Sequence, residues 1–390
     1  MFNLRKTLVL VVSVIAFTVS SYGYPQYVAV GDNTILSSPD GDTWTYRQTD
    51  TAAYFYGVTY GKGLFVAVGQ RKSDYSGAIV SSPDGVTWSD RSPGTGRLYA
   101  ITYGGGQFVA VGTHIILRST DGIYWSPVSL RNIDYTVLLR AVVYADSQYV
   151  AVGFSNVVLT SPDAITWTMK SGNPPPSGPD STFSYTSITY GNDYVRNIYV
   201  ATANDGYGKG YVCTSTDAAV WSRQRVSDKG LSAVTYVDAT MSGAYGVFVI
   251  IGQEVAFKSN QTHPLTWFEC STGSTCAGLV YGYNKFVAVG SMTTIMTSPS
   301  GCPWTGKSQN AILPSPAQQN TWLNAVTYAN IQNISVRYDR INPYVKRGET
   351  RAAHTVVHDA KGRLVHAGNI SHGIYLTQHS TRVLPTLLVH

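Results

Sequence analysis

The chain has 390 residues, of which 12% are aromatic and only 13% are charged, against a charged fraction of about 25% in ordinary domains. It contains 37 Gly and 28 Tyr but only three Glu, a composition that excludes a helical protein and predicts an all-β fold. The net charge of +6 comes almost entirely from residues 330–390, which hold eight Lys and Arg against three acidic residues. The remaining body therefore lacks the basic surface that nucleic acid binding requires.

The first 23 residues have the pattern of a secretory signal peptide. Arg5 and Lys6 precede an apolar run at 7–19, and the small residues Ser21 and Gly23 occupy the −3 and −1 positions of a cleavage site after Gly23. A membrane anchor is the alternative, but thirteen residues fall short of the roughly 20 needed to span a bilayer. We therefore expect a secreted or extracytoplasmic protein, periplasmic in a bacterium, that is not embedded in a membrane.

A repeated motif, Ser-Ser-Pro-Asp-Gly-Asp-Thr-Trp, begins at Ser37 and dominates the rest of the chain. Four similar copies follow, and then two decayed copies at 258–267 and 297–304. The seven copies place Trp at positions 44, 88, 125, 167, 221, 267 and 304. Self-similarity at a period of about 40–45 residues is typical of propellers and related arrays.

A second motif, Val-Thr-Tyr-Gly-Lys-Gly-Leu-Phe-Val-Ala-Val-Gly, occupies residues 58–69. It returns at 101–112, 142–153 and 279–290 and, with insertions, at 188–203 and 234–252. The two motifs together give each repeat four short strands separated by Gly-rich turns, which is the content of one propeller blade. The sequence predicts an all-β, seven-bladed β-propeller with four-stranded blades.

The first repeat predicts how the ring closes. It starts at Tyr27 and lacks the Val-Thr-Tyr strand, and that strand appears after the seventh repeat at 325–328. A C-terminal strand that completes the N-terminal blade would leave no open sheet edge at the seam.

Turn chemistry predicts a structural role for the Asp and Trp residues of the first motif. In Pro39-Asp40-Gly41, Pro presets the first turn dihedral, Asp hydrogen-bonds nearby backbone N–H groups and Gly accepts a positive φ. The Trp that follows is suited to packing between neighbouring blades. The residues expected in this role are Asp40, Trp44, Asp84, Trp88, Asp121, Trp125, Asp163, Trp167, Asp217 and Trp221.

The Ser-x-Asp-Gly-x-x-Trp copies resemble the Asp-box of BNR-type propellers, a superfamily that includes sialidases, sortilin-like receptors and photosystem II stability/assembly-factor-like proteins. The resemblance covers nearly all of residues 24–328 and departs from the familiar box in one respect, because Asp40 and Gly41 are adjacent. It implies the propeller fold and places the boxes on the outer rim, away from the usual ligand face.

Insertions in the repeat indicate where a partner could bind, because loops carry binding residues. They occur at 70–76, 131–140, 171–185 and 204–209, in two loop classes that usually share one propeller face. The candidate ligand-binding residues are Arg71, Tyr75, Arg131, Tyr135, Asp205 and Tyr207. They suit a glycan or a protein partner, and tolerated surface variation is the alternative explanation.

A sialidase-type glycoside hydrolase is the alternative function, and an assembly factor for a membrane protein complex is a third. The hydrolase would need three converging Arg residues and a Tyr nucleophile with a Glu partner. Of the repeats, only the sixth contains Glu, at 254 and 269. The Arg residues at 71, 97, 131, 140 and 196 show no shared spacing. We therefore expect a non-catalytic binding or scaffold module without a cofactor.

The four Cys suggest a disulfide in an exported chain. Cys270 and Cys276 flank a short Gly-containing segment between repeats and are the preferred pair, while Cys213 and Cys302 lie in separate repeats. None has the Cys-x-x-Cys spacing of a zinc or redox site, so no metal is expected.

Residues 330–390 lie outside the repeat and hold six of the eight His at spacings that fit no regular zinc cluster. We expect three parts: a signal peptide at 1–23, the propeller at 24–329 and a basic, poorly ordered tail at 330–390. A monomer is expected. Glycosylation sequons begin at Asn260, Asn333 and Asn369.

Overall fold

The computed structural model describes residues 27–329 with gaps at 48, 95, 131–132, 134–136, 172–182, 194, 239–245, 261–264, 309–312 and 314–320, together with 357–358 and 364–366. The chain divides into two units, Tyr24–Asn330 and the terminal segments Met1–Gly23 with Ile331–His390. In the second unit only β27 (Val357–His358) and β28 (Leu364–His366) are described, and they pair antiparallel. Among the described residues, no helix has the length and apolarity to cross a membrane. The predicted signal peptide and most of the predicted tail lie outside the described residues.

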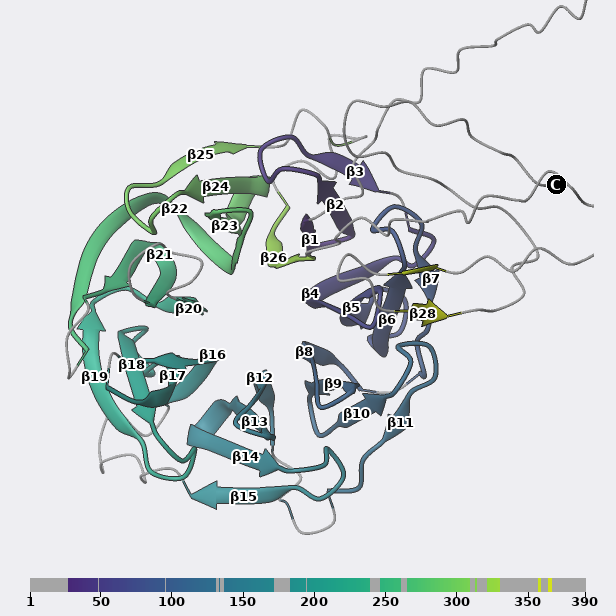
Figure 1. Cartoon of the computed structure of the whole chain (residues 1–390), viewed down its shortest axis with the longest axis horizontal. Helices are drawn as coiled ribbons and strands as arrows, with labels where there is room; N and C mark the ends of the chain where they lie inside the picture. Colours follow the sequence, from purple (N-terminus) through teal and green to yellow (C-terminus); the bar gives the residue numbers. More distant parts are fainter. Residues whose placement is uncertain are drawn as a thin grey trace, which may run out of the picture. The chain divides into compact units, whose positions relative to one another are not determined.

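The first half of unit Tyr24–Asn330 forms sheets of four antiparallel strands (Figure 1). One sheet joins β26 (Leu323–Tyr328), β1 (Tyr27–Gly31), β2 (Thr34–Ser38) and β3 (Thr45–Arg47). The next joins β4 (Ala53–Gly61), β5 (Leu64–Arg71), β6 (Gly77–Ser82) and β7 (Ser89–Asp90). A third joins β8 (Leu98–Gly104), β9 (Gln107–Gly112), β10 (Ile116–Ser119) and β11 (Ser126–Pro127).

The second half continues the pattern with two more four-stranded sheets and a larger one. One joins β12 (Leu139–Ala145), β13 (Gln148–Gly153), β14 (Val157–Ser161) and β15 (Thr168–Ser171), with the short helix η1 (Phe154–Asn156) after β13. The other joins β16 (Ser184–Asn192), β17 (Asn197–Asn204), β18 (Gly210–Ser215) and β19 (Ser222–Ser227). The six-stranded sheet joins β20 (Leu231–Val237), β21 (Val247–Ser259), β22 (Trp267–Gly282), β23 (Lys285–Gly290), β24 (Thr294–Ser298) and β25 (Thr305–Ser308), with η3 (Ser291–Thr293) after β23.

The sheet count corrects the prediction of seven four-stranded blades, because this unit has six sheets, and one of them has six strands. The reason lies in two long strands. β21 pairs with β20 up to Gly252 and with β22 from Gln253 onward. β22 pairs with β21 up to Thr275 and with β23 from Cys276 onward. Both strands change partner without a break, so the sixth and seventh sequence repeats share one sheet.

The inner edges of the sheets contact one another in a closed cycle. β26 contacts β4, and the series continues through β8, β12, β16, β20 and β22 back to β26. Figure 1 shows β26, β4, β8, β12, β16 and β20 around the centre of the ring. The cycle closes as the sequence predicts, because β26 pairs antiparallel with β1, from Tyr27 opposite Tyr328 to Gly31 opposite Leu323.

The second strand of each repeat is buried along its length, because neighbouring sheets cover both of its faces. In β5 every residue from Phe65 to Gln70 is buried. Core clusters cross from sheet to sheet: Val150 and Val152 of β13 pack with Tyr199 and Ala201 of β17. The continuous Phe-Val-Ala-Val run therefore reflects burial on two sides rather than a helix.

Tyrosine hydroxyls tie neighbouring sheets together. Tyr149 donates to the Gly104 carbonyl at 2.5 Å, Tyr199 donates to the Ala145 carbonyl at 3.2 Å, and Tyr27 donates to the Gly282 carbonyl. Burial raises the pKa of Tyr199 to about 12, so these hydroxyls remain neutral donors at physiological pH. The abundant Tyr of the repeat is therefore largely used in assembling the ring.

The disulfide differs from the prediction. Cys270 bonds to Cys302, with 6.4 Å between their Cα atoms, and Cys276 is a buried free thiol, as is Cys213. The segment from 270 to 276 is not a turn but part of β22, and the two Cys lie on either side of the point where that strand changes partner. Cys270 pairs with Ala256 of β21, and Cys276 pairs with Gly290 of β23. The preferred pair was therefore wrong.

Candidate protein-binding site at the inner strands

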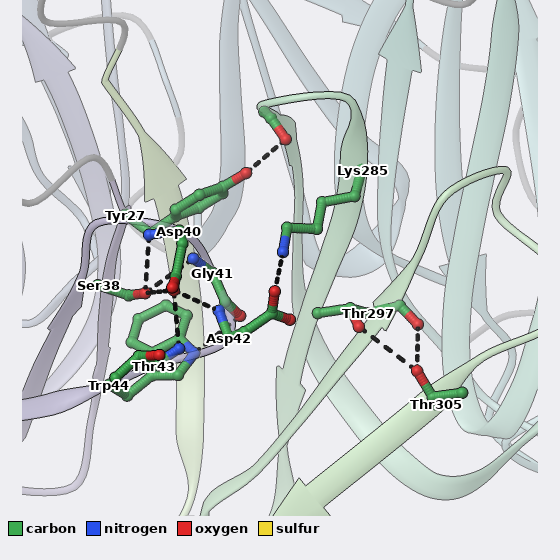
Figure 2. Close-up of polar contacts among 11 residues, drawn as sticks. Tyr27, Ser38, Asp40, Gly41, Asp42, Thr43, Trp44, Lys285, Thr297 and Thr305 are labelled. Atoms are coloured by element: carbon green, nitrogen blue, oxygen red, sulfur yellow. Dashed lines mark hydrogen bonds and ion pairs between the residues drawn. The ribbon is translucent and has the colours of Figure 1, made fainter.

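The first Ser-x-Asp turn, between β2 and β3, shows how the repeated Asp is used (Figure 2). The backbone N–H groups of Asp42 and Thr43 donate to Asp40 Oδ1 at 2.8 and 2.7 Å. The Gly41 N–H donates to Ser38 Oγ at 2.7 Å, and Trp44 Nε1 donates to the Gly41 carbonyl at 2.9 Å. The carboxylate is thus occupied by its own turn.

The next four turns repeat this geometry. The carboxylates of Asp84, Asp121, Asp163 and Asp217 each accept two backbone N–H groups within the turn at 2.7–2.9 Å. Three of the Trp residues that follow, Trp125, Trp167 and Trp221, pack against an aromatic ring of the second strand, as Trp125 does against Phe108 at 6.3 Å. In the structure these Asp residues form hydrogen bonds within their turns, and the Trp residues are buried or half-buried beside them.

The predicted ligand-binding residues are spread over separate hairpins. Arg71 ends β5 and forms an ion pair with Asp90. Tyr75 and Tyr207 lie at the tips of the β5–β6 and β17–β18 hairpins, 68% and 69% exposed. Asp205 is buried and accepts the backbone N–H groups of Tyr207 and Lys209, both at 2.9 Å, so it shapes its own hairpin. Arg131 and Tyr135 lie outside the described residues.

A different set of side chains gathers where the inner strands begin. Every inner strand carries a register shift at this end that leaves one residue without a partner on the second strand. The seven unpaired residues are Asn324, Tyr56, Tyr99, Arg140, Thr186, Ser232 and Ala277. We call these seven residues the bulge ring.

A glycine of the second strand lies beside the bulge in most repeats. At Gly69 an added Cβ would lie 1.9 Å from the Tyr54 carbonyl oxygen, and at Gly112 it would lie 1.9 Å from the Arg97 carbonyl oxygen. The inner strand can approach this closely only where the second strand has no side chain. The same position is Gly in six of the seven repeats, and Ala203 takes it in β17, where the register shift at Thr186 still forms.

The bulge ring is uneven in size and charge. Around the cycle from β26 to β12 it carries Asn324, Tyr56, Tyr99 and Arg140, whereas from β16 to β22 it carries only Thr186, Ser232 and Ala277. The residues two positions before each bulge-ring residue divide in the same way. Those before the four large members are Trp322, Tyr54, Arg97 and Leu138, and those before the three small members are Ser184, Gly230 and Thr275. One side of the ring therefore presents bulky aromatic and cationic groups, and the other presents small ones.

The large side forms a connected aromatic and cationic cluster. The rings of Tyr56 and Tyr99 lie 5.5 Å apart. Arg140 stacks over Tyr99 at 4.7 Å and over Phe154 of η1 at 4.8 Å. Arg97 lies 5.9 Å from the Tyr99 ring, and its guanidinium donates to the Tyr99 hydroxyl at 3.2 Å. Cation–π contacts of this kind hold a guanidinium in place without neutralising its charge.

Asp32 brings one negative charge to the edge of this cluster. It lies in the β1–β2 hairpin beside Asn324, whose amide also donates to the Phe55 carbonyl at 2.9 Å. Burial raises the pKa of Asp32, while the hydrogen bond from Asn324 and the charge of Lys72 oppose the rise. Lys72 in turn lies 4.7 Å from the Tyr54 ring. This acid is already matched by neighbouring donors.

The electrostatics show that Arg97 and Arg140 hold unmatched positive charge. Burial lowers the pKa of Arg140, the charge of Arg97 lowers it further, and Tyr99 and Tyr56 oppose this effect. Burial likewise raises the pKa of Tyr56, against the opposing charge of Arg97. Within the part of the chain that the structure describes, no ion pair engages Arg97 or Arg140. Among the described residues, these two guanidinium groups therefore have no anionic partner.

Arg97 and Arg140 could not be recognised as one site from the sequence. Their linear spacing carries no signal, because the two residues occupy different positions of successive repeats. The bulge position can be found by aligning the repeats on the inner strand, where it lies two residues before the Val or Ile of Val-Thr-Tyr, as in Tyr56-Gly57-Val58 and Arg140-Ala141-Val142. No group of metal-ligating residues occurs among the described positions.

No protein-family model and no curated protein sequence matches the chain. Solved structures do. A structure of YCF48 bound to D1 peptide is 14% identical, covers 76% of this chain and 88% of its own, and has a TM-score of 0.50. A catalytically inactive virginiamycin B lyase from Staphylococcus aureus with quinupristin is 12% identical, covers 73% and 95%, and has a TM-score of 0.51. YCF48 from Cyanidioschyzon merolae is 17% identical, covers 66% and 86%, and has a TM-score of 0.49.

Together with the ring of sheets, the similarities with TM-scores of 0.50 and 0.51 decide the fold. The chain is a β-propeller. At identities this low the likeness extends to the fold and not to an activity. The function of this propeller must therefore be argued from its own side chains.

Proposed function

We propose that this propeller is an extracytoplasmic binding module that holds a segment of a partner protein on its bulge ring. The observation that carries the proposal is the cluster of Tyr56, Tyr99, Arg97, Arg140 and Phe154. Aromatic rings and Arg are the side chains that most often anchor protein partners. The solved YCF48 structure with a bound D1 peptide supports the idea that a propeller of this kind can carry a peptide.

The hairpin tips predicted from the sequence extend the same face. Ala53 at the start of β4 pairs with Arg71 at the end of β5, so the hairpin with Tyr75 lies at the bulge end of the inner strands. The same holds for Ser184 and Asn204, which place the hairpin with Tyr207. We propose that Tyr75 and Tyr207 add outer contacts to a partner centred on the bulge ring.

Superfamily, location and catalysis are part of the same proposal. The Ser-x-Asp turns with their carboxylate-to-backbone hydrogen bonds support assignment to the Asp-box propellers.

The pattern of residues 1–23 supports export, which N-terminal sequencing of the secreted protein would test by finding a start at Tyr24. A glycoside hydrolase gains no support from Glu254, which forms an ion pair with Lys229 at 3.1 Å. An assembly role for a membrane complex remains one form that protein binding could take.

The test is a selection for binding. Random twelve-residue peptides displayed with free C-termini are panned against the intact protein, and a glycan array is probed in parallel. We expect enriched peptides whose affinity falls at least tenfold in Tyr99→Ala. Tyr124→Ala, which removes an exposed ring from a Ser-x-Asp turn, is the matched control and should bind normally. A protein that enriches no peptide, or that binds and cleaves glycans, would refute the proposal.

A further inference from the structure

The partner's chemistry follows from the charge of the bulge ring. Resting on the proposed function, we infer that the bound segment supplies a carboxylate to Arg97 and Arg140 and that its backbone crosses the small side of the ring over Thr186, Ser232 and Ala277. The carboxylate belongs either to an Asp or Glu side chain or to a C-terminus. The recognition is the same in both cases.

The guanidinium groups of Arg97 and Arg140 lie near each other, beside the ring of Tyr99. Both lie against Tyr99, at 4.7 and 5.9 Å from its ring, and within the described chain neither meets a carboxylate. Their mutual repulsion and partial loss of hydration disfavour this arrangement when it is empty. A carboxylate between them relieves both costs, because Arg binds carboxylates through paired, charge-assisted hydrogen bonds.

Asp32 is the acidic residue at the edge of this cluster. Asp32 does not neutralise the charge of these Arg residues, because its partners are the hydrogen bond from Asn324 and the charge of Lys72. The groups that face Arg140 are Tyr99 and Tyr56 from neighbouring inner strands, Phe154 from η1, and Arg97. Three of these are aromatic rings and the fourth is a cation. The site therefore selects an anion that comes from outside the described part of the chain.

The small residues of the bulge ring follow Arg140 in the cycle, because β12 contacts β16. Beyond Arg140 the ring continues with Thr186, Ser232 and Ala277, which are half-buried and small. The backbone here is already satisfied: Thr186 Oγ1 donates to the Leu231 carbonyl at 3.1 Å, and the Leu231 N–H donates to Asn204 Oδ1 at 2.8 Å. A peptide that lies over this side therefore leaves both backbone groups of Leu231 paired.

A peptide that crosses the small side of the bulge ring would place side chains against the other large residues of the ring. Tyr56 of β4 lies across the cycle from Ser232 of β20, and Trp322, 42% exposed, precedes β26, which contacts β22 at the end of the small side. The uneven ring thus gives the segment a direction, with its anionic group at Arg97 and Arg140. A symmetric ring of seven equal residues could not impose one.

The experiment uses the enriched peptide from the selection and three analogues of it. One replaces its acidic residues with Asn or Gln, one has an amidated C-terminus, and one carries both changes. Affinity is measured by fluorescence anisotropy at low and moderate salt. We expect the doubly neutral analogue to bind at least about tenfold more weakly, as for loss of a charged hydrogen bond. The single analogues identify the source of the carboxylate.

The protein variants are Arg97→Gln and Arg140→Gln, with Arg196→Gln as the matched control on an exposed hairpin. The first two should lose affinity for the acidic peptide by about tenfold or more and bind the neutral analogue unchanged. Ser232→Phe should weaken binding of every peptide, whereas Ser89→Phe at the outer edge should not. Thermal melting confirms that each variant is folded.

The outcomes separate the two proposals. If peptides are enriched but bind equally well when neutral, or if Arg97→Gln and Arg140→Gln have no effect on them, the carboxylate inference is wrong and the binding function stands. If no peptide is enriched, the proposed function itself fails. If Ser232→Phe binds normally, the path over the small side is wrong.

Discussion

At the scale of single residues, the same residue type has different roles at the two ends of a strand. Asp163 and Asp217 of the Ser-x-Asp turns are exposed, yet each carboxylate accepts two backbone N–H groups of its own turn. Arg140 is also exposed, but its partners are aromatic rings, so its charge remains available. Exposure alone therefore does not separate structural from functional residues in this protein, whereas hydrogen-bond partners do.

This distinction predicts how substitutions in the second turn behave. Trp88→Ala should lower the free energy of unfolding by about 3–5 kcal/mol, since it empties a buried aromatic site. Asp84→Ala should cost roughly 1–2 kcal/mol for two lost hydrogen bonds. Neither should change peptide affinity in the folded protein. Chemical denaturation and anisotropy measure the two effects, and a selective loss of binding in Asp84→Ala would invert the assignment of structural and functional residues.

The turn carboxylates also predict an acid dependence of stability. The backbone N–H groups of Thr166 and Ile165 lower the pKa of Asp163 to about 2, and backbone hydrogen bonds lower the pKa values of Asp121 and Asp217. Because these pKa values lie below the unfolded value of 3.8, the ionised groups stabilise the fold above that pH, and this contribution is lost as pH falls toward 2.

Melting temperatures measured from pH 6 to pH 2 should therefore fall, with less loss in Asp163→Asn. The amide can still accept backbone N–H groups but does not titrate in this range. The difference between the wild type and Asp163→Asn should shrink toward pH 2. A constant difference over the whole range would show that the charge of Asp163 is irrelevant to stability.

At the scale of elements, the seventh turn shows how a decayed repeat is repaired. Ser300 replaces the Asp, and Pro303 stands where the other turns have the second N–H donor. A donor and its acceptor are therefore lost together. Ser300 Oγ donates to the Cys302 carbonyl at 2.5 Å, and Cys302 is bonded to Cys270 of β22. The disulfide takes over the restraint that the carboxylate provides in the other turns.

Removing the Cys270–Cys302 disulfide should destabilise the turn, and restoring the turn residues of the other repeats should recover part of that stability. Cys302→Ala, or reduction of the wild type, should lower stability by about 2–4 kcal/mol, the usual value for a disulfide. Adding Ser300→Asp and Pro303→Thr to Cys302→Ala restores the acceptor and both donors, so part of the loss should return. Denaturation of the three proteins under the same conditions tests this. Equal stability of the single and triple variants would show that the turn does not need the restraint.

At the scale of the whole molecule, stability depends on closing the cycle of inner strands. β26 supplies one strand of the first sheet and contacts both β22 and β4. Deleting 320–390 should expose the edge of β1 and lower the melting temperature by many degrees. Deleting 332–390 leaves β26 in place and should change little. Equal melting temperatures for the two truncations would refute closure by this strand.

The sequence by itself determined the repeated hairpin, the turn chemistry and the closing strand, because each depends on local residue patterns. Ser-Pro-Asp-Gly specifies its turn wherever it occurs, and alternating apolar residues specify strands. The missing Val-Thr-Tyr in the first repeat and its reappearance at 325–328 were enough to predict closure, which the pairing of β1 with β26 confirms.

Only the tertiary structure decided the sheet count, the disulfide and the site. Strand β21 joins two strands of the sixth repeat and β22 continues from the sixth repeat into the seventh, because pairing partners, not residue propensities, end a strand. Cys270 of β22 bonds to Cys302 and not to Cys276. Arg97 and Arg140 lie 43 positions apart in the chain and meet at Tyr99 only after neighbouring inner strands pack side by side. A binding site of this kind depends on how the repeats are arranged around the ring, which local sequence patterns do not encode.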